Sequence, residues 1–133
     1  MLARYFDPEA DEPRERTVTD AAEVATLLVE LTGMGAGSGR GAPALELEAD
    51  NGSALSIGPT PHGDVLLWTD PLEDTFHSIG DRSREGTVVF DYFGSYTEVP
   101  MESVVPRELA LGAARAFLTT GSPVTEELTF EPD

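Results

Sequence analysis

Histidine is the residue type in this 133-residue sequence best suited to metal binding or acid–base chemistry, because there is no cysteine. One histidine, His62, stands between a proline and a glycine, which is typical of a loop. The other, His77, follows Asp74 by three residues, a spacing that joins side chains on a helix but separates them on a strand. Since the residues around His77 alternate as in a strand, we expect neither a metal site nor a catalytic pair, and no cofactor.

A glycine-rich run and several carboxylate pairs are the other candidates for chemistry. The run Gly37-Ser38-Gly39 lies after a predicted helix and before a predicted strand, the reverse of a dinucleotide-binding loop. Its serine also lacks the strand-to-helix turn of a hydrolase nucleophile, so we interpret the run as a connector. Neighbouring acids such as Glu73 and Asp74 arise from composition in a chain with 25 acidic residues. The sequence therefore predicts a protein without catalytic activity.

Acidic side chains dominate the predicted surface. The formal net charge is −17, and all eight basic residues are arginine. The acids are spread along the chain and do not form a tail. Such a surface repels nucleic acid and anionic membranes and attracts basic proteins. The alternative is that the charge serves only to keep a small protein in solution.

The length and the apolar patterning indicate one domain over residues 1–133, large enough to bury a single core. No apolar run approaches the roughly 20 residues that span a membrane. The first residues reach an acid at Asp7 without the apolar stretch of a signal peptide. Together with the lack of cysteine, this favours a cytoplasmic protein.

Two segments have the pattern of amphipathic helices. Asp20 and Glu23 form a capping box ahead of apolar residues at helical spacing. This pattern predicts a helix over Asp20–Thr32 that ends at Gly33. A second helix, Pro106–Thr119, begins with a proline, which suits a first turn, and its small alanines permit close approach to a sheet.

The remaining segments read as strands. Acids alternate with apolar residues from Leu45 to Asp50, which predicts a strand with one solvated acidic face. Val65–Trp68 is apolar on both faces, as expected of a central strand. Thr87–Phe93 is the run richest in β-prone residues, and a turn is predicted at Gly94-Ser95. The sequence therefore predicts a single α+β domain, a mainly antiparallel sheet of about five to seven strands covered by two helices.

The segment from Phe90 to Asp133 carries a resemblance to a known family. The matching residues are Tyr92, Gly94, Thr97, Val99, Pro100, Pro106, Ala114, Phe117, Leu118, Thr120, Gly121 and Pro123. Their order resembles the C-terminal half of the first numbered immunity-protein family of bacterial polymorphic toxin systems. Two departures, a turn with only Ser122 before Pro123 and Phe130 in place of an expected tryptophan, leave the identity of the toxin open.

The resemblance implies an immunity protein that binds and neutralises a cognate toxin by blocking its active site or substrate groove. In this family the toxin is often a nucleic-acid deaminase. One alternative is a small-molecule-binding protein or enzyme with an unrecognised carboxylate site, and another is an acidic structural or self-assembling domain. The neighbouring reading frame separates the first two, because a toxin-like gene supports immunity and a metabolic operon supports an enzyme. The oligomeric state stays open.

The partner-binding surface is expected where aromatic anchors and steering charges meet on rigid elements. The late strands and the turn before them supply such residues: Glu73, Asp74, Asp91, Phe93, Tyr96 and Glu98. A rival surface is the acidic face of Glu46, Glu48 and Asp50, which lacks aromatic anchors.

Two residues keep two interpretations each. Asp91 interrupts an apolar strand, so its carboxylate is either solvated on an exposed face or an acidic contact flanked by aromatic rings. Trp68 belongs either to the core or to an interface.

Overall fold

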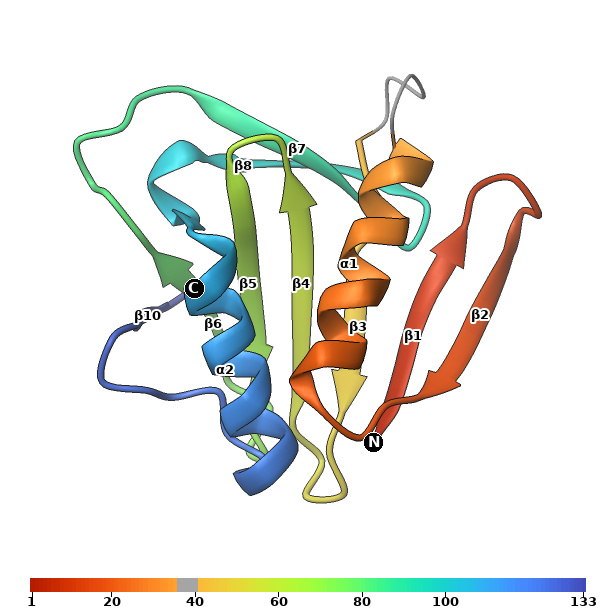
Figure 1. Cartoon of the computed structure of the whole chain (residues 1–133). Helices are drawn as coiled ribbons and strands as arrows, with labels where there is room; N and C mark the ends of the chain where they lie inside the picture. The colour runs from red at the N-terminus through yellow and green to blue at the C-terminus, as the bar shows by residue number, and fades with distance from the viewer. Residues whose placement is uncertain (36–40) are drawn as a thin grey trace.

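The computed structural model describes residues 1–35 and 41–133 (Figure 1). In chain order the elements are β1 (Leu2–Asp7), β2 (Glu12–Thr17), α1 (Ala21–Gly35), β3 (Leu45–Glu48), β4 (Ala54–Thr60), β5 (Gly63–Thr69), β6 (Thr75–Ile79), β7 (Thr87–Tyr92), β8 (Ser95–Pro100), the short 3-10 helix η1 (Met101–Ser103), β9 (Val104–Val105), α2 (Arg107–Thr120) and β10 (Thr129–Pro132).

Eight of the strands form one antiparallel sheet in the order β10-β6-β5-β4-β3-β1-β2, with β9 added against β5. The other two, β7 and β8, form a separate hairpin. Figure 1 shows α1 and α2 side by side over one face of the large sheet. The predicted α+β class with an antiparallel sheet and two helices is confirmed. The large sheet exceeds the expected strand number because the two-residue strand β9 is too short to leave a pattern.

The helix-covered face holds the main core. Alternation along the strands directs Leu55 and Ile57 of β4 and Leu66 of β5 toward the helices, and all three are fully buried. On α1, four apolar residues at helical spacing are buried against them: Val24, Leu27, Leu28 and Leu31. The helix α2 presents alanines and Phe117, which lets its backbone approach the sheet closely. The helix-covered face is therefore closed to a partner.

The opposite face of the sheet carries the β7–β8 hairpin. Val65 of β5 points to this side and packs in a second cluster with Val88 and Phe90 of β7. At its centre, the ring of Phe90 lies directly over Gly58 of β4. A β-carbon added to Gly58 would stand 2.7 Å from the Cγ atom of Phe90, closer than atoms can pack. This glycine therefore lets the hairpin rest on the sheet.

One buried ion pair joins α2 to the sheet. Asp64, fully buried at the start of β5, accepts hydrogen bonds from Arg107 in the first turn of α2, with Nε to Oδ2 at 2.6 Å and Nη2 to Oδ1 at 3.0 Å. Burial raises the pKa of the Asp64 carboxyl, and the guanidinium of Arg107 opposes that rise. The paired geometry is bidentate, which fixes the direction in which α2 leaves β9.

Replacing Gly58 by alanine tests the packing of the hairpin, through Phe90, on the large sheet. The added methyl group overlaps the Phe90 ring, and overpacking of this kind costs about 1–3 kcal/mol of the free energy of unfolding. Gly112→Ala is the matched control, because Gly112 lies inside α2 with no atom near its added β-carbon. That control is expected to stabilise the protein by about 0.5–1 kcal/mol. Urea unfolding of both variants decides, and a G58A protein as stable as the wild type would contradict the packing described.

Removing the guanidinium partner of Asp64 gives a second stability test. Arg107→Leu leaves a buried carboxylate without compensation, which is expected to cost about 3–5 kcal/mol in urea unfolding. The double variant Asp64→Leu/Arg107→Leu removes both charges and is expected to recover most of that loss. Arg115→Leu, an exposed arginine on the same helix, serves as the control and should change stability by less than about 0.5 kcal/mol. Equal effects of the two single changes would show that the pair contributes nothing specific.

Candidate functional site

The tip of the β7–β8 hairpin is a two-residue turn. Tyr92 pairs with Ser95, so Phe93 and Gly94 alone connect the strands, with φ values of 49° and 90°. Positive φ at both central positions is the signature of a type I′ turn, whose twist matches that of the strands. The predicted turn at Gly94-Ser95 is wrong by one residue, and the consequence is that Phe93 belongs to the turn and not to the strand. A phenylalanine at positive φ is uncommon.

The two faces of the hairpin have different roles. Phe90 and Tyr92 point toward the large sheet with Val88. The cross-strand pair of Val89 with Glu98 lies on the outer face, where Glu98 is exposed. Tyr96 is 57% exposed, which is high for an aromatic side chain held on a strand. The hairpin therefore exposes an aromatic side chain and a carboxylate, and their contact with a partner stays a prediction.

Asp91 occupies a different environment from its strand neighbours. Its N–H donates to the carbonyl of Ala42 and its carbonyl accepts from the N–H of Ala44, each at 2.8 Å. The segment of residues 42–44 thus lines the edge of β7 away from β8, and Asp91 is only 2% exposed. The interpretation of a solvated face is wrong for this residue, because a second stretch of backbone covers it.

A pocket of about 410 Å³ opens beneath the hairpin tip, and we call it the tip pocket. Its lining residues are Arg4, Pro13, Glu15, Glu46, Tyr92 and Phe93. The rings of Tyr92 and Phe93 meet edge to face with centroids 5.2 Å apart. These residues come from β1, β2, β3 and the hairpin, so no local pattern in the sequence could have assembled them. Phe93 and Glu46 were named from sequence on two different predicted surfaces, whereas Arg4, Pro13, Glu15 and Tyr92 were not named as contact residues.

Arg4 organises the acidic residues of β3. Its Nη2 atom lies 3.1 Å from the Oε1 atom of Glu46 and also contacts the carboxylate of Glu48. Burial raises the pKa of Glu46, although the hydrogen bond from Arg4 opposes the rise. The predicted solvated acidic face is therefore wrong for Glu46, which is half-buried and paired. Asp50, beyond the end of β3, is exposed.

The turn between β5 and β6 lies at the other end of the sheet. Ala54 and Thr69 pair there, whereas Gly58 contacts the hairpin at the far end of β4. The structure thus separates Glu73 and Asp74, both exposed in this turn, from the residues of the hairpin. The six predicted contact residues do not form one surface.

This turn also holds a residue that the sequence analysis missed. The carboxylate of Asp70 accepts the N–H groups of Leu72 and Asp74 at 2.9 and 3.0 Å, and the backbones of Asp70 and Asp74 bond at 2.9 Å. Leu72 is 83% exposed on top of this tight turn. An apolar residue between a proline and two acids was the available signal. The turn presents a second, smaller combination of apolar and acidic side chains.

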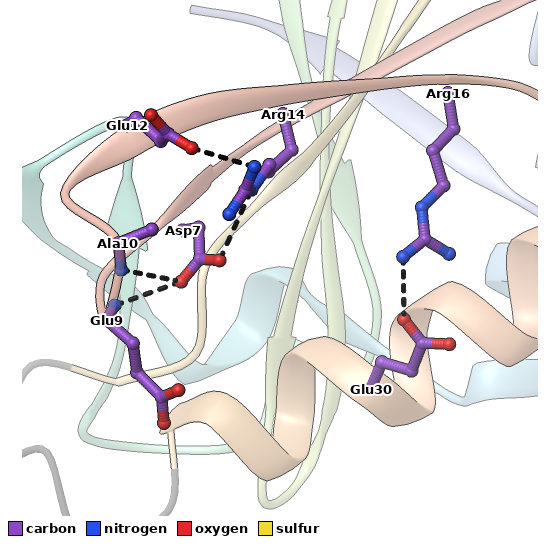
Figure 2. Close-up of polar contacts among 7 residues, drawn as sticks. All are labelled: Asp7, Glu9, Ala10, Glu12, Arg14, Arg16 and Glu30. Carbon is purple, nitrogen blue, oxygen red and sulfur yellow. Dashed lines mark hydrogen bonds and ion pairs between the residues drawn. The ribbon is translucent and has the colours of Figure 1, made fainter.

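The β1–β2 arm borders the tip pocket. Every residue of β2 is exposed, and the strand is an edge of the sheet. Figure 2 shows how ion pairs cover it: Arg14 Nη1 lies 2.7 Å from Glu12, and Arg16 Nη2 lies 3.5 Å from Glu30 of α1. Alternating charges on an exposed edge disfavour pairing with another strand. The arm is therefore not suited to sheet extension.

The turn of the arm is fixed by one carboxylate (Figure 2). Asp7 Oδ1 accepts the N–H groups of Glu9 and Ala10 at 2.9 and 3.3 Å, and Asp7 Oδ2 lies 3.4 Å from Arg14 Nε. The backbone hydrogen bond from Ala10, followed by that from Glu9, holds the pKa of Asp7 below its ordinary value.

Trp68 packs against the main core. Its ring stacks on Phe76 with centroids 4.9 Å apart and meets Phe130 edge to face at 5.5 Å. The indole Nε1 donates to Ser53 Oγ at 2.8 Å. These contacts favour a structural role over an interface, and Phe130 supplies the aromatic partner at the position where tryptophan was expected.

The histidines do not assemble a reactive site in the described part of the chain. His77 Nδ1 lies 2.6 Å from Asp133 Oδ1, so its acidic partner is the last residue and not Asp74. His62 is exposed in a turn. Within residues 1–35 and 41–133 no three histidine, aspartate or glutamate residues are placed to hold a metal ion. The run Gly37-Ser38-Gly39 lies outside the described residues.

In the described residues, 1–35 and 41–133, neither helix is long and apolar enough to cross a bilayer.

The lowered pKa of Asp7 predicts a pH-dependent contribution to stability. A carboxyl whose folded pKa lies below its unfolded pKa of about 4 stabilises the fold above that pH, and the contribution is lost as pH falls through the folded pKa. The difference in free energy of unfolding between wild type and Asp7→Asn should therefore be constant near neutral pH and shrink below about pH 4. Urea unfolding between pH 2.5 and 7 measures it, with Glu9→Gln as the control for net charge. A difference that grows in acid would contradict the turn geometry.

Comparison with known proteins identifies a family model that the chain matches. The family model described as Immunity protein Imm1 matches residues 12–126, which covers β2 through the loop before β10. No curated protein matches the chain at a significant level. The matched region contains both helices, the β7–β8 hairpin and all lining residues of the tip pocket except Arg4. The chain belongs to the Imm1 family of immunity proteins.

Proposed function

We propose that this protein binds the toxin domain of a polymorphic toxin and neutralises it without catalysis, by covering the active site or substrate groove. The observation that carries the proposal is the Imm1 family match over residues 12–126. The fold supports it, because the exposed aromatic and acidic residues of the hairpin stand on a rigid turn and strand. Rigid anchors lose little side-chain entropy on binding.

A nucleic-acid deaminase acting in the cytoplasm is the toxin class we propose. The family resemblance suggests it, and the charge of the protein is compatible with it. An enzyme that binds nucleic acid needs a basic groove to hold phosphates. The immunity protein, with its net charge of −17, is attracted to such a groove and oriented by it.

The hairpin is the better placed of the two candidate surfaces. It exposes Tyr96 and Glu98, and Phe93 in its turn lines the tip pocket, whereas the turn around Leu72 lies at the other end of the sheet. Affinity concentrates where anchors sit beside concave, desolvated surface. We therefore place the toxin contact at the hairpin and assign Glu73 and Asp74 to steering of the approaching partner.

The test uses the toxin domain encoded in the neighbouring reading frame. Tyr96→Ala is expected to raise the dissociation constant about 30-fold, equivalent to about 2 kcal/mol, because it removes the exposed ring. Glu98→Gln should slow association a few-fold at low salt and little at high salt, since screening shortens the reach of the lost charge. Leu72→Ala is the matched control at the other end of the sheet. Calorimetry gives stoichiometry and affinity, and stopped-flow gives rates.

The outcomes are distinct. A 1:1 complex weakened by Y96A and not by L72A supports the hairpin, while the reverse pattern moves the contact to the β5–β6 turn. Absence of any complex with the wild-type protein would refute the proposed function. Co-expression adds a cellular readout: Asp74→Asn and His77→Asn should still protect cells, because the proposal gives neither side chain a chemical role. Loss of protection in either variant would reopen the enzyme alternative.

A further inference from the structure

The tip pocket carries an excess of negative charge. Arg4 is the one base among its described lining residues, and it faces Glu15 across the β1–β2 pair and Glu46 across the β1–β3 pair. Glu48 also contacts Arg4. Three carboxylates thus lie near one guanidinium. The net charge of this group is negative, and a second cation would reduce it.

The state of Glu46 agrees with that balance. Its side chain is 17% exposed, and burial keeps its pKa raised even though Arg4 donates a hydrogen bond to it. Glu48 raises the pKa of Glu46 further. A second cation would stabilise the charged form of the Glu46 carboxyl, because Arg4 alone has not offset the loss of hydration that burial causes.

Two of the residues that line the pocket are aromatic. The rings of Tyr92 and Phe93 meet edge to face, and both residues share the lining with Glu15 and Glu46. A planar cation between an aromatic face and carboxylates gains cation–π attraction and charge-assisted hydrogen bonds together. Guanidinium suits this arrangement better than ammonium, since it is flat and weakly hydrated, stacks on rings and bonds carboxylates in pairs.

We propose that the tip pocket receives an arginine side chain of the toxin, held between the ring of Phe93 and the carboxylates of Glu15 and Glu46. The proposal rests on the proposed function and names the chemistry of the contact beside Tyr96. It uses two features of the pocket, the excess acid and the aromatic lining residues.

The conformation of Phe93 supports a role in binding. It occupies a turn position, with φ of 49°, at which asparagine or glycine is favoured. Asparagine at this position would give an Asn-Gly turn with less backbone strain. The sequence therefore carries phenylalanine at some cost in stability, and its ring lines the pocket.

The first experiment needs no toxin. Ethylguanidinium, which reproduces the end of an arginine side chain, is titrated into the ¹⁵N-labelled protein, with the neutral isostere ethylurea as control. We expect saturable millimolar shifts at the amides of Glu15, Glu46 and Phe93, and none with ethylurea. The shifts should vanish in Glu15→Gln/Glu46→Gln and in Phe93→Asn, and persist in Glu126→Gln, an exposed acid outside the lining. Absence of saturable shifts in the wild-type protein overturns the proposal.

The second experiment uses the toxin domain. Phe93→Asn should raise Tm by about 2–4 °C, through relief of the turn, and yet weaken toxin binding about tenfold. Opposite signs for stability and affinity separate a lost contact from a damaged fold. Glu15→Gln/Glu46→Gln should weaken binding by a similar factor, with Glu126→Gln unchanged. If the toxin binds all these variants as it binds wild type, the pocket assignment fails and the proposed function stands. If the wild type binds no toxin, the proposed function fails, and the ethylguanidinium titration still decides what the pocket accepts.

Discussion

The contact of the Phe90 ring with Gly58 is the constraint on which the outer layer of the protein depends. A sheet face of this size needs cover, and the helices occupy only the other side. Phe90 fills the space over Gly58 that any side chain at that position would take. The hairpin is thereby fixed across the sheet, and its tip is placed above the β1–β2 arm. The position of Tyr96 and the shape of the tip pocket follow from that one approach.

The arginines named here form ion pairs within the fold, whereas the excess acidic side chains remain at the surface. Arg107 binds the buried Asp64, Arg4 binds two glutamates of β3, and Arg14 and Arg16 cover the exposed edge of β2. With these bases held in internal pairs, the excess acid of a chain with a net charge of −17 is directed outward. Under the proposed function, this charge attracts a basic toxin and the exposed aromatic residue of the hairpin anchors it.

Local sequence patterns predicted the helices and strands, but they did not predict the contacts between segments that are far apart in the sequence. The first helix was expected to end at Gly33 but continues to Gly35, because a helical glycine is tolerated where nothing opposes it. The second helix was right to within one residue at each end. Burial of Asp91 and assembly of the tip pocket were not predictable, since both arise where segments far apart in the sequence meet. Tyr96 was named from sequence and is exposed in the structure, whereas Tyr92, beside the same turn, packs against the second cluster. The contact of Tyr96 with a partner stays a prediction.

We propose that the toxin contacts the tip of the hairpin. Hydrogen–deuterium exchange of the full protein, free and saturated with the toxin domain, tests it most directly. We predict that binding protects the backbone amides of residues 92–98 and of β2, and leaves the turn of residues 70–74 and the helices unchanged. Protection confined to α1, α2 or the turn of residues 70–74, with no change at the hairpin, would contradict a toxin contact at the hairpin tip.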